Sequence, residues 1–410
     1  AAGNVGIAST QPKTRLDIQN GAFQIGPAGI CTATTVNTTN LVNATQLSHR
    51  NIIINGAMRV NQRATSSTTS GMQTVDRFLC QFGGTDEALT QEQGSIGTSD
   101  IGPFEEGFIK SFKITNGNQS SGAGAADYVE IYTVIEDFDI SSSGWNYKSS
   151  SSYITISFWV KSSVAQKFPG FFYTNQAGAG DSFMYSYQID NGSGGNLSAN
   201  TWTKITHSIP GNTSLSFNND NTRGLSVGIF PFNGTDNSTS GHTDGAWAAW
   251  STSNKIKDMT STWYTTNDAT FEITGVQLEV GSVATPFEHR NFADDTQLCR
   301  RYFQVNGAVS GDHMMWGWGR AEGNSARVAI PVPVPMRAAP TVAATANRSF
   351  KYDGTAVQST ETPSLFGSGA WVSHASSYTV DFPSGGSLSH NNAYIVTSDS
   401  GSKLTMDAEL

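Results

Sequence analysis

The chain has 410 residues, of which 37% are hydrophobic and only 14% are charged, and its formal net charge is −9. Long surface helices normally carry many charged side chains, so this composition disfavours a helix-rich protein and favours strands joined by Gly-, Ser- and Asn-rich turns. The acidic balance disfavours a nucleic-acid partner and an anionic membrane surface, because both need clusters of lysine and arginine. The sequence holds no stretch of about 18 apolar residues, so no membrane insertion is expected.

The cysteines and the first residues of the chain indicate the cellular compartment in which the protein is made. Cys31, Cys80 and Cys299 are odd in number and far apart, which fits neither a disulfide framework nor a CxxC metal site. The opening AAGNVGIAST lacks the basic and apolar regions of a signal peptide. We therefore expect synthesis in a reducing cytoplasm.

Residues 1–48 differ from the rest of the chain. Short alternating pieces, Val5 with Ile7 and Leu16 with Ile18, are separated by Gly and Pro, and a polar stretch with sparse apolar residues follows. Such a segment buries little by itself. It is expected to be a docking or trimerising segment that needs other copies or a partner, and the alternative is a disordered tail.

Residues 49–293 show the pattern of a jelly-roll β-sandwich. Runs such as SSYITISFWVKSS, TWTKITHSIP and GLSVGIFPF alternate apolar and polar positions, and long Gly- and Asn-rich loops separate them. Many short alternating strands with such turns are typical of a two-sheet sandwich.

The stretch ITGVQLEVGSVATPFEHR changes its alternation at a glycine. Phe271 and Ile273 share one parity, whereas Val276 and the apolar residues after it take the other. A β-bulge at Gly275 would cause this slip and would bend the strand. We expect a curved edge strand, followed by a packed and hydrogen-bonded corner that joins this domain to the next and consists of Phe287, Glu288, His289 and Arg290.

Residues 294–410 predict a short linker helix and a C-terminal β-sandwich head. Asp294 or Asp295 could cap the helix, and Arg300 and Arg301 suit its C-terminal end. In RVAIPVPVPMR the three prolines share one parity, so this run predicts an edge strand or a polyproline segment and not a central strand.

The sequence carries no catalytic motif that would define an enzyme. Two acidic clusters, Glu105 with Glu106 and Glu136 with Asp137 and Asp139, could cut glycans only if the fold held two of the carboxylates a few ångströms apart. No cofactor and no metal are expected, although the loop NNDNTRG could offer oxygens to a structural Ca²⁺.

Tryptophans beside polar loops are the candidate glycan-binding residues. A flat ring with a polar rim can stack on a sugar ring. The alternative is that these rings belong to the core or to a trimer interface. Trp316 and Trp318 are expected on one strand face, and the candidates are Trp247, Trp250, Trp316 and Trp318.

Several motifs together resemble a known family. NIIINGAMRVNQR, TVDRF, ISFWVKS, TGVQLEVGSVATPFEHR, LCRRYFQ and the final DAEL resemble tail-fibre and appendage proteins of bacteriophages, especially phages of marine bacteria. GNVGIAST and PKTRLDI resemble segments of fibre proteins as well. The resemblance implies a homotrimeric virion appendage whose N-terminal segment docks to other virion proteins. The chain shows no long coiled-coil or triple-β shaft and no His-x-His repeat, so we expect a short fibre without a metal-stapled tip.

The expected function is therefore a short trimeric tail fibre that recognises host surface polysaccharide without catalysis, located on the virion as a tail or capsid appendage. One alternative is a capsid-decorating fibre or knob, or a tail adaptor, whose main partner is another virion protein. Another is a polysaccharide depolymerase, which would need two carboxylates facing an aromatic groove.

Overall fold

The computed structural model describes two compact units, residues 1–44 and residues 45–410. The described residues are 5–7, 16–18, 49–174, 182–307, 315–345, 348–352, 355–359, 362–365, 377–384, 388–389, 392–398 and 402–410. In the first unit, β1 (Val5–Ile7) pairs in parallel with β2 (Leu16–Ile18). The remainder of the expected docking segment, including Cys31, lies outside the described residues, and the expected domain boundaries near residues 48 and 293 stay predictions.

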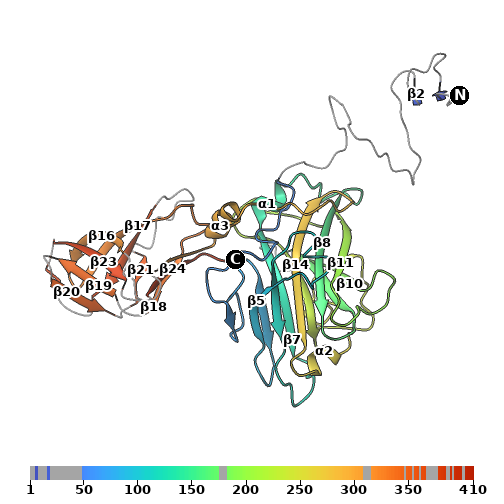
Figure 1. Cartoon of the computed structure of the whole chain (residues 1–410), viewed down its shortest axis with the longest axis horizontal. Helices are drawn as coiled ribbons and strands as arrows, with labels where there is room; N and C mark the ends of the chain where they lie inside the picture. Colours follow the sequence, from blue (N-terminus) through green and yellow to red (C-terminus); the bar gives the residue numbers. More distant parts are fainter. Residues whose placement is uncertain are drawn as a thin grey trace. The chain divides into compact units, whose positions relative to one another are not determined.

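Residues 49–290 form an all-β jelly-roll sandwich, as the sequence predicts (Figure 1). Its two six-stranded sheets are antiparallel, and their inward side chains build one hydrophobic core. The first sheet has the order β13-β10-β9-β12-β7-β4, with β4 (Leu79–Gly83), β7 (Tyr128–Glu136), β9 (Phe168–Thr174), β10 (Phe183–Ile189), β12 (Arg223–Asn233) and β13 (Trp247–Ala249). The second has the order β11-β8-β14-β6-β5-β3, with β3 (Ser66–Ser67), β5 (Thr90–Ser95), β6 (Lys110–Thr115), β8 (Tyr153–Ser162), β11 (Thr203–Pro210) and β14 (Thr270–Val280). Two short helices, α1 (Asp137–Ser141) and α2 (Thr262–Thr265), join strands.

The core follows the predicted alternation. On β12, Leu225, Val227 and Ile229 point into the core, and on β8 Ile154 and Ile156 do the same. Burying each such side chain contributes about 1.5–3 kcal/mol. Phe230, the next residue after Ile229 on β12, therefore faces away from the second sheet.

The predicted bulge in β14 is confirmed. The register against β8 shifts between Thr274 and Gln277, and Gly275 has a φ of +63°. A Cβ at Gly275 would lie 2.6 Å from the ring of Phe108, so both the backbone conformation and the space require glycine. The expectation of an edge strand is wrong, because β14 lies between β8 and β6 in the sheet. Its central position lets the bulge curve the whole sheet.

The linker helix is α3 (Phe292–Arg300), and its cap differs from the expected one. The side chain of Asn291 accepts a hydrogen bond from the Asp294 backbone N–H at 2.9 Å, so Asn291 caps the helix and Asp294 lies in its first turn. An extended backbone at Asn291 permits this geometry, which the aspartates inside the helix cannot adopt.

The described residues between 303 and 407 form the C-terminal β-sandwich head. A three-stranded sheet has the order β15-β24-β18, with β15 (Phe303–Gly307), β18 (Thr341–Thr345) and β24 (Lys403–Asp407). A seven-stranded sheet has the order β20-β19-β23-β16-β17-β22-β21, with β16 (Met315–Glu322), β17 (Ser325–Pro331), β19 (Arg348–Tyr352), β20 (Thr355–Ser359), β21 (Ser364–Leu365), β22 (Ser377–Pro383) and β23 (Ala393–Ser398).

The proline run forms an edge only at Pro331, and Pro333 and Pro335 lie beyond the end of the strand. β17 lies between β16 and β22 over Ser325–Val328, so its first half is a central strand. Pairing with β16 stops at Val328, and the strand ends at Pro331, before the other two prolines. The stretch from Ala329 to Pro331 pairs with β22 alone, so Pro331 lies on a strand with one partner, where a missing amide leaves no ladder hydrogen bond unmade.

Residues 407–410 are held by arginines of the sandwich. Glu409 pairs with Arg77 and, at 3.1 Å, with Arg63. Arg223 Nη2 donates to the Leu410 backbone oxygen at 2.7 Å. The side chain of Arg77 is only 2% exposed, and its guanidinium carbon lies 3.4 Å from the ring centre of Tyr302. These contacts fix the DAEL sequence on the jelly roll.

Candidate functional site

The outer face of the first sheet is unusually aromatic. Tyr132 on β7, Phe171 and Tyr173 on β9, and Phe230 on β12 all take outward positions, because their neighbours in each strand belong to the core. Outward positions of a sandwich strand are normally polar. This face must therefore be covered by another part of the chain or be available to a ligand.

Residues 234–260, which we call the strap, cover part of this face. Ile256 in the strap is fully buried against Phe171, Met184 and Phe230. A polar network ties the strap to β10: Ser186 Oγ donates to Asp244 at 2.5 Å and lies 2.6 Å from His242 Nε2. The strap is thus both an apolar cover and a hydrogen-bonded element of the sandwich.

The uncovered part of the face is a cleft of about 160 Å³, which we call the aromatic cleft. Tyr173 and Trp250 lie side by side in it, with ring centroids 5.8 Å apart and planes inclined at 55°. Trp250 keeps 40% of its surface exposed. The lining residues are Glu130, Tyr132, Phe171, Tyr173, Met184, Arg223, Ser226, Phe230, Trp250 and Lys255.

Charged and polar groups lie beside these rings. Lys255 Nζ lies 3.5 Å from Glu130 Oε1, and both side chains are more than four-fifths buried. Burial raises the pKa of Glu130, and the charge of Lys255 opposes this shift. The Tyr132 hydroxyl lies 3.1 Å from Gln81 Oε1, and burial raises the pKa of this tyrosine. The cleft therefore combines apolar ring faces with hydrogen-bonding groups that are partly removed from water.

Such an arrangement can bind a ligand. Most glycan hydrolases use two carboxylates, and the described lining of the cleft does not provide two. Glu130 is the carboxylate among the described lining residues. Glu136, Asp137 and Glu106 from the acidic clusters of the sequence make structural contacts instead. Glu136 forms a two-oxygen pair with Arg301 at 2.6 and 2.8 Å. Asp137 accepts backbone N–H groups of Asn218 and Asn219. Glu106 accepts from Trp159 and Lys204.

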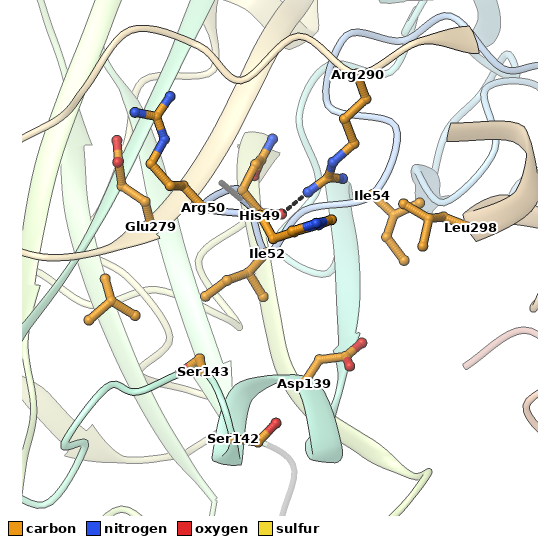
Figure 2. Close-up of a pocket in the computed structure, with 12 residues that line it drawn as sticks. His49, Arg50, Ile52, Ile54, Asp139, Ser142, Ser143, Glu279, Arg290 and Leu298 are labelled. Carbon is orange, nitrogen blue, oxygen red and sulfur yellow. Dashed lines mark hydrogen bonds between the residues drawn. The ribbon is translucent and has the colours of Figure 1, made fainter. Parts of the chain in front are cut away.

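A second hollow of about 320 Å³ lies beside the start of the sandwich (Figure 2). Ile52, Ile54 and Leu298 give it an aliphatic lining, and Figure 2 shows Asp139 on the side opposite to Arg290. Both oxygens of Glu279 already accept hydrogen bonds from Thr285. The described residues that line it include no Phe, Tyr or Trp ring for stacking.

The structure separates the four candidate tryptophans. Trp250 lies in the aromatic cleft, whereas Trp247 packs on Tyr185 at 5.5 Å and donates to the Pro210 carbonyl at 2.8 Å. Trp316 is buried in the head, and Trp318 is 72% exposed. The expectation that Trp316 and Trp318 share a face is wrong, because the β16–β23 register shifts between Met315 and Gly317.

The corner residues pack as a unit. The ring centroids of Phe287 and Phe108 lie 4.8 Å apart, and His289 Nε2 lies 2.8 Å from the Glu106 carbonyl oxygen. Glu288 accepts from the Asn51 backbone N–H at 2.9 Å, and Arg290 donates to the backbone carbonyls of Asn51 and Ile53. These four residues tie the end of β14 to residues 51–53, and none of them lines the aromatic cleft.

Metal and membrane features are few in the described part of the chain. There, no group of three His, Cys, Asp or Glu side chains is arranged to hold a metal ion. In the loop NNDNTRG, Asp220 Oδ1 accepts from Thr222 N and Oγ1, and Asn221 donates to the Arg337 carbonyl. None of the described helices has the length and apolarity needed to cross a bilayer.

The fold and the site define an all-β protein with a jelly-roll sandwich that presents an aromatic cleft on one outer sheet face. No protein-family model matches the chain, and no curated protein matches it. Among solved structures it is similar to a protein from Bacteroides thetaiotaomicron described as sugar-binding, at 12% identity and a TM-score of 0.29, over 57% of this chain and 100% of that chain. It is also similar to an exo-β-agarase, at 9% identity and a TM-score of 0.25, over 62% of this chain and 40% of that chain.

A third similar structure is the N-terminal tandem of CBM22 domains of Paenibacillus barcinonensis Xyn10C, at 9% identity and a TM-score of 0.23, over 80% of this chain and 92% of that chain. Likeness at these TM-scores carries no functional argument.

Proposed function

We propose that the chain is a glycan-binding protein and that the aromatic cleft is its binding site. The observation that carries this proposal is the pairing of Tyr173 with the half-exposed Trp250 beside Glu130 and Lys255. A sugar ring has an apolar face that stacks on aromatic rings and hydroxyl groups that need donors and acceptors at its edge. The cleft supplies both within about 160 Å³.

We also propose that the protein is a virion appendage, and this part of the proposal is supported by the phage-like sequence motifs. A short trimeric fibre on a virion would present three weak sugar sites together, and multivalency would convert them into useful avidity. Residues 1–48 would then contact other virion proteins. A capsid-decorating fibre or a tail adaptor fits the same fold, whereas a depolymerase would need a second carboxylate beside Glu130.

The test of the binding site is a glycan microarray, followed by titration calorimetry with the strongest hit. Trp250→Ala and Tyr173→Ala should each lower the affinity about tenfold or more, since each removes an aromatic contact worth more than about 1.4 kcal/mol. Trp318→Ala is the matched control, because it removes an exposed tryptophan from the head. Loss of binding in Trp318→Ala with full binding in Trp250→Ala would move the site to the head and refute the cleft.

The virion role has a separate test. Immunogold electron microscopy with an antibody against residues 303–410 should label the tail or its collar on intact particles. Label over the capsid would favour the decoration protein, and unlabelled particles would refute the virion assignment while leaving the glycan site standing.

A further inference from the structure

The charge in the aromatic cleft differs from the charge of the whole chain. The chain is strongly acidic, with a formal net charge of −9. The described residues that line the cleft nevertheless contribute two cations, Arg223 and Lys255, against one carboxylate, Glu130. A positive cleft in a negative protein focuses anions toward the site.

Lys255 has binding capacity beyond its contact with Glu130. Their separation of 3.5 Å exceeds the roughly 2.7–2.9 Å of a strong charge-assisted hydrogen bond. The ammonium group has three donors, and its side chain is only 18% exposed. A cation this far removed from water gains from a second anionic acceptor, which a bound ligand can provide.

The backbone holds Lys255 in place before any ligand arrives. Its N–H donates to the Asn237 carbonyl at 3.1 Å, and the next residue, Ile256, is buried and pairs with Ser238. The strap therefore needs no rearrangement to present this ammonium, and preorganisation lowers the entropic cost of binding.

The other two charged groups favour the same ligand class. Arg223 uses Nη2 to hold the Leu410 carbonyl, and its planar guanidinium carries five donors in a fork that matches a carboxylate or a sulfate. Glu130, whose pKa burial raises, lies against Lys255 and is the single carboxylate among the described lining residues.

We propose that the aromatic cleft selects acidic saccharides, whose rings carry a carboxylate or a sulfate ester, over neutral ones. This inference rests on the proposed glycan-binding function. The ring of the sugar would stack on Tyr173 and Trp250, and its anionic group would lie against Lys255 and Arg223.

The experiment uses the full chain and matched polysaccharide pairs that differ in charge: polygalacturonate with its methyl ester, and dextran sulfate with dextran, together with an array of acidic and neutral glycans. Titration calorimetry should give at least about tenfold tighter binding to acidic members, because hydrogen bonds to charged groups are stronger. Lys255→Gln should remove about tenfold of this preference. Lys257→Gln, which changes an exposed lysine two residues away and outside the cleft, should leave it within about twofold.

Four outcomes separate the two proposals. Acidic preference that Lys255→Gln abolishes and Lys257→Gln keeps supports the inference. Equal binding of acidic and neutral glycans that Trp250→Ala abolishes overturns the acidic selectivity and leaves the glycan site standing. Acidic binding that both lysine variants weaken equally overturns the inference in favour of general surface charge. Absence of binding to every glycan overturns both proposals.

Discussion

Replacing Glu409 tests whether the DAEL sequence stabilises the jelly roll through a buried ion pair. Glu409 contacts Arg77, whose side chain is 2% exposed, and Arg63, whose side chain is 9% exposed. Glu409→Gln removes the negative charge and leaves a buried cation without its counterion. Removing one partner of a buried pair costs about 3–5 kcal/mol.

The local structure places the expected cost near the lower end of this range. Arg77 keeps its hydrogen bond to the Val134 carbonyl and its contact with the Tyr302 ring. Arg63 keeps Asp76 at 3.2 Å. The glutamine side chain can still accept one hydrogen bond. We expect the free energy of unfolding to fall by about 3 kcal/mol.

Asp407→Asn is the matched control. Asp407 contacts Arg63 at 3.6 Å, but its side chain is 45% exposed, so its loss should cost less than about 1 kcal/mol. Urea unfolding followed by tryptophan fluorescence and by far-UV circular dichroism measures both variants, and coincident curves establish a single transition. If Glu409→Gln unfolds within about 1 kcal/mol of Asp407→Asn, the buried pair does not stabilise the fold as argued.

Two further predictions concern β14 and its corner. Gly275→Ala should lower the free energy of unfolding by at least about 1–2 kcal/mol, because it forces an alanine to a φ of +63° and against Phe108. Gly97→Ala is the control, because a Cβ at Gly97 meets open space. Equal urea midpoints of the two variants would contradict the need for glycine at the bulge. Burial by itself would raise the pKa of Glu288. The hydrogen bond from the Asn51 N–H and the charge of Arg290 outweigh burial, so the pKa lies below its ordinary value of 4.5. A lowered pKa stabilises the fold above pH 4.5 and loses that contribution as the pH falls, so Glu288→Gln should flatten the decline of Tm between pH 5 and 3, and an unchanged slope would contradict it.

The bulge at Gly275 is a feature that the local sequence pattern is sufficient to predict. Alternation along a strand fixes which side chains face the core, and one inserted residue reverses the parity. Gly275 and the residues around it therefore predict the bulge without any knowledge of neighbouring strands. The same reasoning failed to place β14 in the middle of its sheet, because strand order depends on partners far away in the sequence.

The aromatic cleft is a feature that the local sequence pattern is insufficient to predict. Aromatic residues at outward positions of β7, β9 and β12 are visible in YVEIYTVIE, FPGFFYT and GIFPF, and this signal could have identified Tyr132 and Tyr173. Their convergence with Trp250 and Lys255 depends on a strap that arrives from residues 234–260. The prediction of Trp250 named one member of the site, and the sequence offered no means to choose it over Trp247, Trp316 or Trp318.

By itself, the sequence determined an all-β protein, the jelly-roll pattern, the bulge at Gly275, the linker helix and the β-sandwich head. These features follow from alternation, turn chemistry and charge, which act between residues close together in the chain. Only the tertiary structure decided which strands are central, which tryptophans are buried and where the aromatic cleft lies. Those features depend on pairing and packing between residues that are often more than a hundred positions apart, such as Glu130 and Lys255.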